Sequence, residues 1–323
     1  MAPPVKPSLE DIEAATKLVY AHTRPTLQIP WPLLARRCGA EVWVKHENHT
    51  PIGAFKVRGG LVYLDRLRRE RPDVEGVVTA TRGNHGQSIA YAAQRFGLAA
   101  TVVVPHGNNP EKNAAMKAFG AELVEHGRDF DDSCTHAQEL ASRRGIFMLP
   151  SFDVGLVCGV ATYGLELLRA VPDLDTVYVP IGLGSGICGM IAVRDALGLA
   201  TRIVGVVAER APAYALSFAA GEPVATNAAD TLADGVAVRV PDVDALRIIG
   251  AGAERVVTVT DEAILAAMAH LFTDTHNLAE GAGAAPLAAL LQEKEAMAGK
   301  KIGLVLTGGN ADKALFKRAL EAQ

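Results

Sequence analysis

The sequence predicts an α/β protein whose strands form mostly parallel sheets covered by helices. Short runs rich in Val and Ile alternate with longer segments of helical period along nearly the whole chain, which is the order expected of strand–helix–strand units. The short runs are apolar on both faces rather than at alternate residues, as in strands that are buried from both sides.

The individual elements follow from this pattern. A first helix is expected to begin at Ser8, which can cap its N-terminus while Asp11 reaches back to it. Gly97 and Gly120 are each followed at once by an apolar run, so they are expected to end helices. The runs that read as strands are 41–47, 76–80, 100–105, 121–126, 176–180, 202–209, 255–259 and 301–307. The amphipathic segments that read as helices include 84–97, 110–120, 132–145 and 261–277.

Composition limits the function classes. A chain of 323 residues with 49% hydrophobic and 21% charged residues is typical of a compact protein with room for two ordinary domains. A net charge of -4 argues against nucleic acid and anionic membranes as partners. No apolar run reaches the roughly 20 residues of a membrane span, and prolines and acids stand where a signal peptide would have a basic start. The four cysteines are far apart, which favours neither a zinc site nor disulfides. We therefore expect a cytoplasmic protein with a small-molecule partner.

The domain organisation is read from the same pattern. Residues 47–150 read as a compact strand–helix block, which predicts a small domain inserted into a larger one made of residues 1–46 and 151–323. Residues 221–242 form the longest irregular segment. Segments of this kind are more often functional than decorative.

One lysine stands in unusual surroundings. In "TPIGAFKVRGG", residues 50–60, Lys56 follows a Gly-Ala-Phe turn and precedes a helical pattern. A surface lysine needs no such setting. A lysine that bonds covalently to an aldehyde does, because the turn fixes its direction and the neighbours limit water.

Two glycine-bearing turns between a strand and a helix suit anions. The first contains Thr81, Arg82, Gly83, Asn84 and His85. Backbone N–H groups at a helix start can bind a carboxylate there, although a simple helix cap by Asn84 is the alternative. The second, "GLGSG", contains Gly182, Gly184 and Gly186 with Ser185 between them, and can cradle a phosphate. It lacks the third-glycine spacing of a dinucleotide fingerprint, but Glu209 follows the next strand, so nicotinamide binding stays open.

A third turn, "TGGN", follows the last strand. Its strand ends at Thr307, and Asn310 is expected to start a helix. The Thr307 hydroxyl would then face a ligand at the strand end, where open α/β sheets bind ligands. The alternative is a final strand–turn–helix without a ligand.

With these segments in this order, the chain resembles fold type II pyridoxal-phosphate enzymes, and most closely the serine/threonine dehydratase and serine racemase group. "GAFKVRG" is similar to the family's "GSFKxRG", "TRGNHGQ" to "SSGNHGQ", "GLGSG" to its glycine-rich phosphate loop and "TGGN" to "SGGN". "ADGV" at 233–236 and "AEGAGAA" at 279–285 extend the resemblance over nearly the whole chain. It implies two open, mostly parallel twisted sheets flanked by helices, as in the tryptophan synthase β fold, and a homodimer.

The resemblance also implies residue roles. Lys56 would carry the cofactor as a Schiff base and act as the catalytic base, Phe55 would flank the pyridine ring, and Asn84 would bond its 3'-oxygen. Thr307 would face the ring nitrogen without protonating it, which favours prompt loss of a β-substituent. The phosphate would be held by Gly182, Leu183, Gly184, Ser185 and Gly186. The substrate would be held by Thr81, Arg82, Gly83, Asn84 and His85.

The activity implied is that of a dehydratase, or ammonia-lyase. It would eliminate water from a 3-hydroxy amino acid (3-hydroxyaspartate, threonine or serine) and give a 2-oxo or imino acid and ammonia, with the leaving hydroxyl protonated by the cofactor phosphate. A β-replacement enzyme of the cysteine synthase kind is the alternative with the same cofactor. A nicotinamide-dependent oxidoreductase or a non-catalytic binding module would leave Lys56 and "TGGN" unused.

The sequence departs from the family at several positions. The racemases carry a serine where this chain has Arg82, and a guanidinium cannot accept a proton at neutral pH. Arg82 suits a second substrate carboxylate, as in 3-hydroxyaspartate, or it forms a structural salt bridge. Leu183 and Ser185 replace glycines that are common in the dehydratases.

A divalent-cation site is only weakly supported. Glu209 matches the first acid of the site that many relatives have, and Ala213 could supply a backbone carbonyl, but Ala215 stands where a second acid is expected. Mg²⁺ binding is therefore a weak prediction. No regulatory domain is expected after Gln323, which fits a catabolic role.

Overall fold

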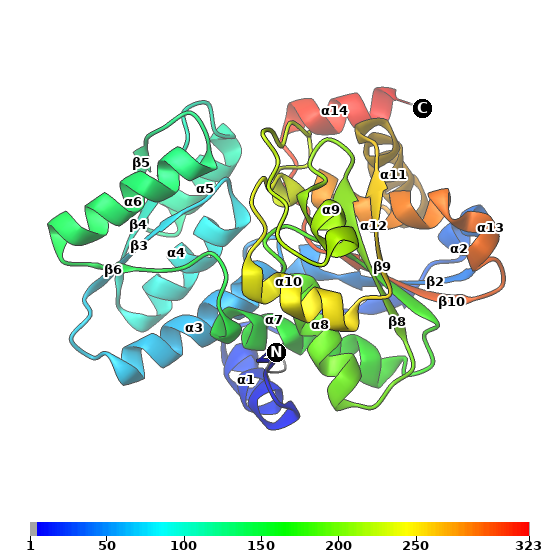
Figure 1. Ribbon diagram of the computed structural model, residues 1–323, viewed down its shortest axis with the longest axis horizontal. Coiled ribbons are helices and arrows are strands. Elements are labelled where there is room, and N and C mark those ends of the chain that lie inside the picture. Colours follow the sequence, from blue (N-terminus) through cyan, green and yellow to red (C-terminus); the bar gives the residue numbers. More distant parts are fainter. Residues whose placement is uncertain (1–4, 323) are drawn as a thin grey trace.

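The computed structural model describes residues 5–322, and the first four residues of the predicted large domain and Gln323 lie outside this range. Its strands form two sheets (Figure 1). The larger has the order β1 (Gln28–Pro30), β2 (Glu41–His46), β10 (Lys301–Leu306), β7 (Thr176–Pro180), β8 (Arg202–Ala208) and β9 (Arg255–Val259). The smaller has the order β5 (Glu122–Glu125), β4 (Ala99–Val104), β3 (Gly76–Ala80) and β6 (Phe147–Met148). All neighbouring pairs are parallel except β1 and β2.

Helices cover both faces of each sheet. On one face of the larger sheet lie α2 (Pro32–Cys38), α11 (Asp261–Thr275), α12 (Gly281–Gln292) and α14 (Lys313–Glu321). On its other face lie α1 (Leu9–His22), α7 (Val154–Ala170), α8 (Ser185–Ala196) and α10 (Val243–Gly252). The smaller sheet packs against α3 (Lys56–Glu70), α4 (Asn84–Phe96) and α5 (Pro110–Ala118) on one face, and against α6 (Phe130–Arg144) on the other. The short elements are α9 (Ala213–Ala220), α13 (Lys294–Met297), η1 (Glu47–His49) and η2 (Asp234–Val236).

The two sheets with their helices lie side by side, and helix α3 links them. It packs against α4 of the smaller part and against α7 of the larger part, and Figure 1 shows it at the base between the two. Strands β3 to β6 all fall within residues 47–150. The division into two domains at the predicted boundaries stays a prediction.

The α/β fold with mostly parallel sheets is confirmed, and each predicted strand run forms a strand. Ser8 and Asp11 form the expected capping box of α1. The prediction that Asn310 starts a helix is wrong: α14 begins at Lys313 and is capped by Asp312. The Asn310 side chain instead donates to the Ile52 carbonyl, so it fastens the turn rather than capping a helix.

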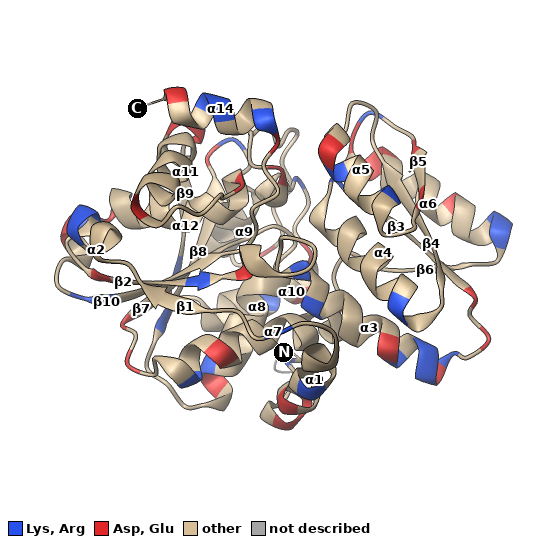
Figure 2. Cartoon of the chain, turned by 180° about the vertical axis from the view of Figure 1, so that it is seen from behind, with Lys and Arg blue, Asp and Glu red and all other residues tan. Residues whose placement is uncertain are grey.

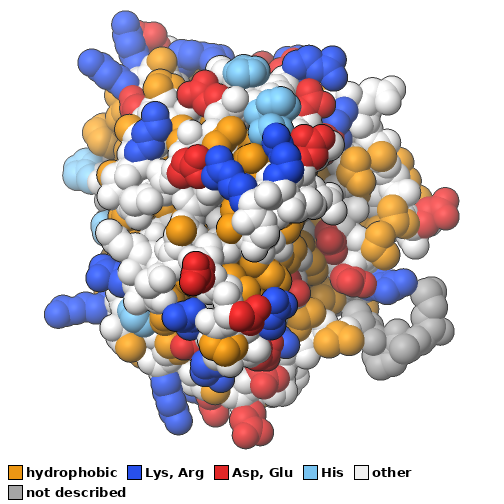
Figure 3. Space-filling model, turned by 90° about the vertical axis from the view of Figure 1, so that its left-hand side faces the viewer, with side chains coloured by type: hydrophobic (Ala, Val, Ile, Leu, Met, Phe, Trp, Pro, Cys, Tyr) orange, Lys and Arg blue, Asp and Glu red, His pale blue; other side chains and the backbone are white. Residues whose placement is uncertain are grey.

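The surface carries both signs of charge. Figure 2 shows basic and acidic residues interspersed on the helices, and Figure 3 shows the same mixture on the face of the smaller part. Within residues 5–322, no helix has both the length and the apolar character needed to cross a bilayer.

Candidate active site

One pocket opens between the two parts of the molecule, with an empty volume of about 910 Å³ including its mouth. Its walls come from the carboxyl ends of β3, β7 and β10 and from the first residues of α3, α4 and α8. This is where parallel α/β sheets bind ligands, because the strand ends leave room and the helix starts present free N–H groups. Residues from distant parts of the sequence therefore meet in one cavity.

Lys56 is the first residue of α3 and is held by the turn before it. The Thr50 hydroxyl accepts from the Ala54 N–H and donates to the Ala54 carbonyl. The Phe55 N–H donates to the Thr307 carbonyl at 2.9 Å, which joins this turn to the end of β10. Burial lowers the pKa of Lys56 to about 8. A buried amine with a lowered pKa can act as a nucleophile or base near neutral pH.

The start of α8 forms a second wall of the pocket. Gly184 precedes the helix with φ 102°, a left-handed conformation that glycine adopts without strain. A Cβ on Gly182 would lie 2.4 Å from the Gly235 carbonyl oxygen, so that position also requires glycine. No side chain caps the helix, and its first N–H groups have no intrahelical acceptor. The loop can therefore hold a phosphate at the positive end of the helix dipole.

The start of α4 forms the opposite wall. The Thr81 hydroxyl accepts from the N–H groups of Gly83 and Gly86, so it holds the loop in place. No side chain caps α4, so the alternative in which Asn84 is a simple cap is wrong. The Asn84 amide instead donates to Glu280. Burial, with a smaller effect of Lys56, lowers the pKa of His85 to about 3, so this imidazole is neutral.

Four charged side chains gather on one side of the pocket. Lys112 Nζ lies 3.4 Å from both Asp234 and Glu280, and Arg82 Nε lies 3.9 Å from Asp234. Burial alone would lower the pKa of Lys112, but Glu280 and Asp234 raise it above its ordinary value. The Arg82 Nε atom is itself buried, and within residues 5–322 it has no hydrogen-bond partner. Two cations and two anions thus balance each other, and the Arg82 Nε–H group lacks an acceptor among the described residues.

The acids and lysine of this cluster were not predicted as site residues. Asp234 and Glu280 stand inside the "ADGV" and "AEGAGAA" segments, so the resemblance could have indicated them. Lys112 lies in an amphipathic helix of ordinary composition, and no local signal distinguishes it from a surface lysine. Its role arises from the contact between α5 and the irregular segment 221–242.

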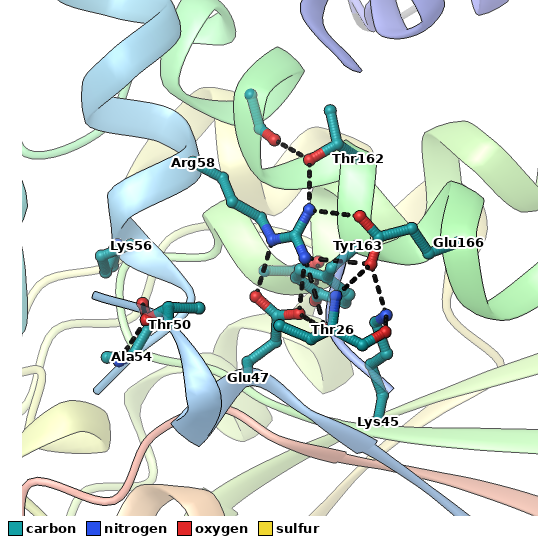
Figure 4. Close-up of polar contacts among 12 residues, drawn as sticks. Thr26, Lys45, Glu47, Thr50, Ala54, Lys56, Arg58, Thr162, Tyr163 and Glu166 are labelled. Carbon is teal, nitrogen blue, oxygen red and sulfur yellow. Dashed lines mark hydrogen bonds and ion pairs between the residues drawn. The ribbon is translucent and has the colours of Figure 1, made fainter. Parts of the chain in front are cut away.

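Behind Lys56, a buried ionic network fixes the start of α3 (Figure 4). Arg58 donates to Glu47 at 2.7 Å and to Glu166 at 2.6 Å, and Lys45 donates to Glu166 at 2.5 Å. The Arg58 and Glu47 side chains are 0% exposed. Burial alone would lower the pKa of Arg58, but these carboxylates raise it. Because Arg58 follows Lys56 by only two residues, the network anchors the helix start that carries the lysine.

The structure brings every predicted cofactor- and substrate-binding residue to this pocket. They are Phe55, Lys56, Thr81, Arg82, Gly83, Asn84, His85, Gly182, Leu183, Gly184, Ser185, Gly186 and Thr307. Glu209 and Ala213, the predicted metal ligands, are not among the lining residues, and Glu209 is exposed. Among residues 5–322, no three His, Cys, Asp or Glu side chains gather into a metal-binding group. The structure gives the cation site no support.

Comparisons with known proteins agree with this arrangement. A family model described as pyridoxal-phosphate dependent enzyme matches residues 19–308. An L-threonine ammonia-lyase of Geobacter sulfurreducens is 37% identical over 92% of this chain and 71% of its own length. An L-threo-3-hydroxyaspartate ammonia-lyase of Saccharomyces cerevisiae is 30% identical over 95% of this chain and 94% of its own. Among solved structures, a pyridoxal 5'-phosphate-dependent aspartate racemase superposes with a TM-score of 0.91 at 30% identity, covering 96% of this chain and 98% of that one.

Proposed function

The chain belongs to the family of pyridoxal-phosphate dependent enzymes, and from this premise we propose which residues hold the cofactor and which amino acid it acts on. It is a pyridoxal-phosphate-dependent ammonia-lyase, a dehydratase that removes water from a 3-hydroxy amino acid. The relatives favour neither a β-replacement enzyme nor a nicotinamide oxidoreductase.

The residues of the pocket fit the cofactor. A covalent link to the cofactor requires an amine that is held in one direction and is partly neutral. Lys56 supplies this amine, because burial lowers its pKa to about 8. The uncapped start of α8 with its glycine loop suits the phosphate, and the Phe55 ring stands beside the amine, 5.2 Å from Lys56 Nζ. The neutral hydroxyl of Thr307 would contact the pyridine nitrogen of the cofactor. When bound, the cofactor supplies an electron sink that makes the α-proton of an amino acid acidic.

The chain's own groups then perform the proton transfers. Lys56, once free, takes the α-proton at Nζ, because desolvation keeps much of the amine neutral near pH 8. Free N–H groups at the start of α4 bind the substrate α-carboxylate. His85 stays neutral and does not compete for the proton.

The unpaired donor of Arg82 carries the substrate proposal. Its Nε atom is buried in the wall of the pocket, where none of the described residues accepts a hydrogen bond from it. A buried unpaired donor costs free energy until a ligand meets it. Its contact with Asp234, at 3.9 Å, is too long for a hydrogen bond. A second substrate carboxylate would satisfy this donor. We therefore infer a dicarboxylic substrate of the 3-hydroxyaspartate kind, the amino acid named for the yeast relative.

Threonine is the second candidate. The Geobacter relative, named for threonine, is the more similar of the two by sequence. In that case Arg82 would pair with Asp234 and hold the rim of the pocket, which is the salt-bridge alternative.

Substitution of Arg82 distinguishes the two candidate substrates, 3-hydroxyaspartate and threonine. If its guanidinium binds a second carboxylate, the wild-type kcat/KM for 3-hydroxyaspartate exceeds that for threonine and serine by about ten- to a hundredfold, since a hydrogen bond to a charged group contributes about 1.5–3 kcal/mol. Arg82→Ser then removes most of the preference and leaves serine turnover nearly intact. The measurement is 2-oxo acid formation from the three amino acids, for wild type and variant side by side.

Equal losses on all three substrates would show that Arg82 holds the loop or the common α-carboxylate. A wild-type preference for threonine would contradict the dicarboxylate proposal and favour the second candidate. Arg128→Ser serves as a control, because this arginine is highly exposed and lies outside the pocket lining.

Thr307→Asp tests the contact with the ring nitrogen. A carboxylate at this position would hold that nitrogen protonated, because opposite charges stabilise each other at short range. We expect slower elimination, more transamination and a changed absorption spectrum of the bound cofactor. Unchanged elimination with an unchanged spectrum would show that Thr307 does not touch the ring.

Three further expectations belong to the proposal. The boundaries at residues 47 and 150 separate a small domain from a large one, the protein acts in the cytoplasm, and it assembles as a homodimer. Light scattering on a sizing column measures the last directly, and a monomer at micromolar concentration would contradict it.

A further inference from the structure

The phosphate loop, residues 182–186, is held from outside the pocket by two buried tyrosine hydroxyls. The Tyr163 hydroxyl, on α7, donates to the Gly186 carbonyl at 2.8 Å. The Tyr214 hydroxyl, on α9, donates to the Leu183 carbonyl at 2.9 Å. The two tyrosines are only 0% and 1% exposed, yet neither lines the pocket. A cofactor bound in the pocket would therefore leave both hydrogen bonds in place.

Both tyrosines are fixed donors. Burial raises the pKa of Tyr163 and of Tyr214, so both phenols keep their protons at neutral pH. The Tyr214 oxygen also accepts from the Asp242 N–H at 3.0 Å, and the Asp242 side chain caps α10. The loop packs closely on this helix, since a Cβ on Gly184 would lie 2.7 Å from the Ala245 Cβ. Tyr214 thus fastens the loop to the start of α10.

The two hydrogen bonds set the direction of peptide groups in the loop. A trans peptide group points its C=O and its N–H in opposite directions. A Leu183 carbonyl that is held by Tyr214 outside the pocket therefore leaves the Gly184 N–H on the pocket side. The first N–H groups of α8, which have no intrahelical acceptor, add to this set of donors. Such a set of N–H groups is what an anion binds at a helix start.

We propose that Tyr163 and Tyr214 are positioning residues for the cofactor phosphate, because they hold the loop in its binding shape before the cofactor arrives. Donors that are already in place bind more tightly, since less conformational freedom is lost on binding. Neither tyrosine touches the reacting atoms, so neither is a catalytic residue. The proposal rests on the assignment of residues 182–186 as the phosphate loop.

The test compares pyridoxal phosphate with pyridoxal, which has the same ring and aldehyde but no phosphate. Cofactor-free protein is titrated with each compound, and the absorption of the bound ring gives the two Kd values. In the wild type, the phosphate should improve Kd by about a hundredfold or more, since several charge-assisted hydrogen bonds are gained. Tyr214→Phe should raise Kd for pyridoxal phosphate about tenfold and leave Kd for pyridoxal within about twofold, because only the loop loses its support.

Tyr163→Phe should show the same selective loss at a smaller size. The Gly186 carbonyl lies within α8 and keeps its intrahelical N–H donor, whereas the Leu183 carbonyl lies before the helix. We expect Kd for pyridoxal phosphate to rise about threefold. Circular dichroism checks that both variants are folded.

Equal losses with both compounds would overturn the proposal, because they would show that the tyrosines support the fold in general. An unchanged Kd for pyridoxal phosphate in both variants would also overturn it. If the wild type bound both compounds equally well, the assignment of the phosphate loop itself would fail. A wild-type preference for pyridoxal phosphate that both variants keep in full would refute the role of the tyrosines alone.

Tyr91→Phe is the matched control. The Tyr91 side chain is buried and its hydroxyl donates to the His22 carbonyl at 3.2 Å, but the residue does not line the pocket. This variant loses a hydrogen bond of the same kind at a site away from the phosphate loop. Both Kd values should stay at the wild-type level, and a selective loss as large as that of Tyr214→Phe would contradict the proposal.

Discussion

Lys56→Ala is expected to lower turnover by more than a thousandfold while leaving a folded protein. The lysine would provide both the covalent link and the base, so its removal costs at least roughly 4 kcal/mol in the barrier. Burial is the cause of the lowered pKa of this side chain, and Lys56 forms no ion pair within the described residues 5–322. Truncation should therefore not weaken the fold. Activity is measured as 2-oxo acid release, and folding by circular dichroism.

The matched control is Lys117→Ala. Lys117 lies on α5, is exposed and does not line the pocket, so this variant should keep wild-type activity. If Lys56→Ala retained more than about a thousandth of the activity, another group would have to be the base.

The second large effect is on stability. Arg58→Leu should lower the free energy of unfolding by about 3–5 kcal/mol, because removal of one partner leaves buried carboxylates without their counter-charge. Glu47 is 0% exposed and Glu166 is 7% exposed, and Lys45 alone would remain to balance them. Urea unfolding of the wild type and the variant, without cofactor, measures the difference.

A control on the same helix isolates the effect of burial. Arg66 pairs with Glu70 on α3, but both side chains are more than half exposed. Arg66→Leu should change the free energy of unfolding by no more than about 0.5 kcal/mol, since exposed ion pairs contribute little. Similar losses in the two variants would contradict the view that the network anchors α3.

The fold was predictable because its strands are buried on both faces. Runs such as 203–208 and 302–306 are apolar throughout, as expected of strands that are buried from both sides. Strands β1 and β6 were missed because they have only 3 and 2 residues, and their pairing depends on neighbours distant in sequence. Asn310 was misread as a helix start because its amide bonds across the fold to Asn84 and the Ile52 carbonyl.

The site was predictable where its residues are consecutive. Each of the three turns combines a strand end, a glycine and a helix start, so local chemistry indicates a ligand. The cluster of Lys112, Asp234 and Glu280 joins three segments that are distant in the sequence, and the segment of Lys112 carries no ligand signal of its own. The contact of Lys56 with Ser185 spans 129 positions. Only the packing of the two parts of the molecule creates these contacts.

The central claim is that Lys56 carries the cofactor. Reduction of the reconstituted protein with borohydride fixes pyridoxal phosphate to the amine that binds it, and mass spectrometry of the peptides then locates the modified lysine. We predict a single modified site at Lys56, and none in Lys56→Ala. A pyridoxyl group on another lysine, or no incorporation into the wild type, would contradict the account.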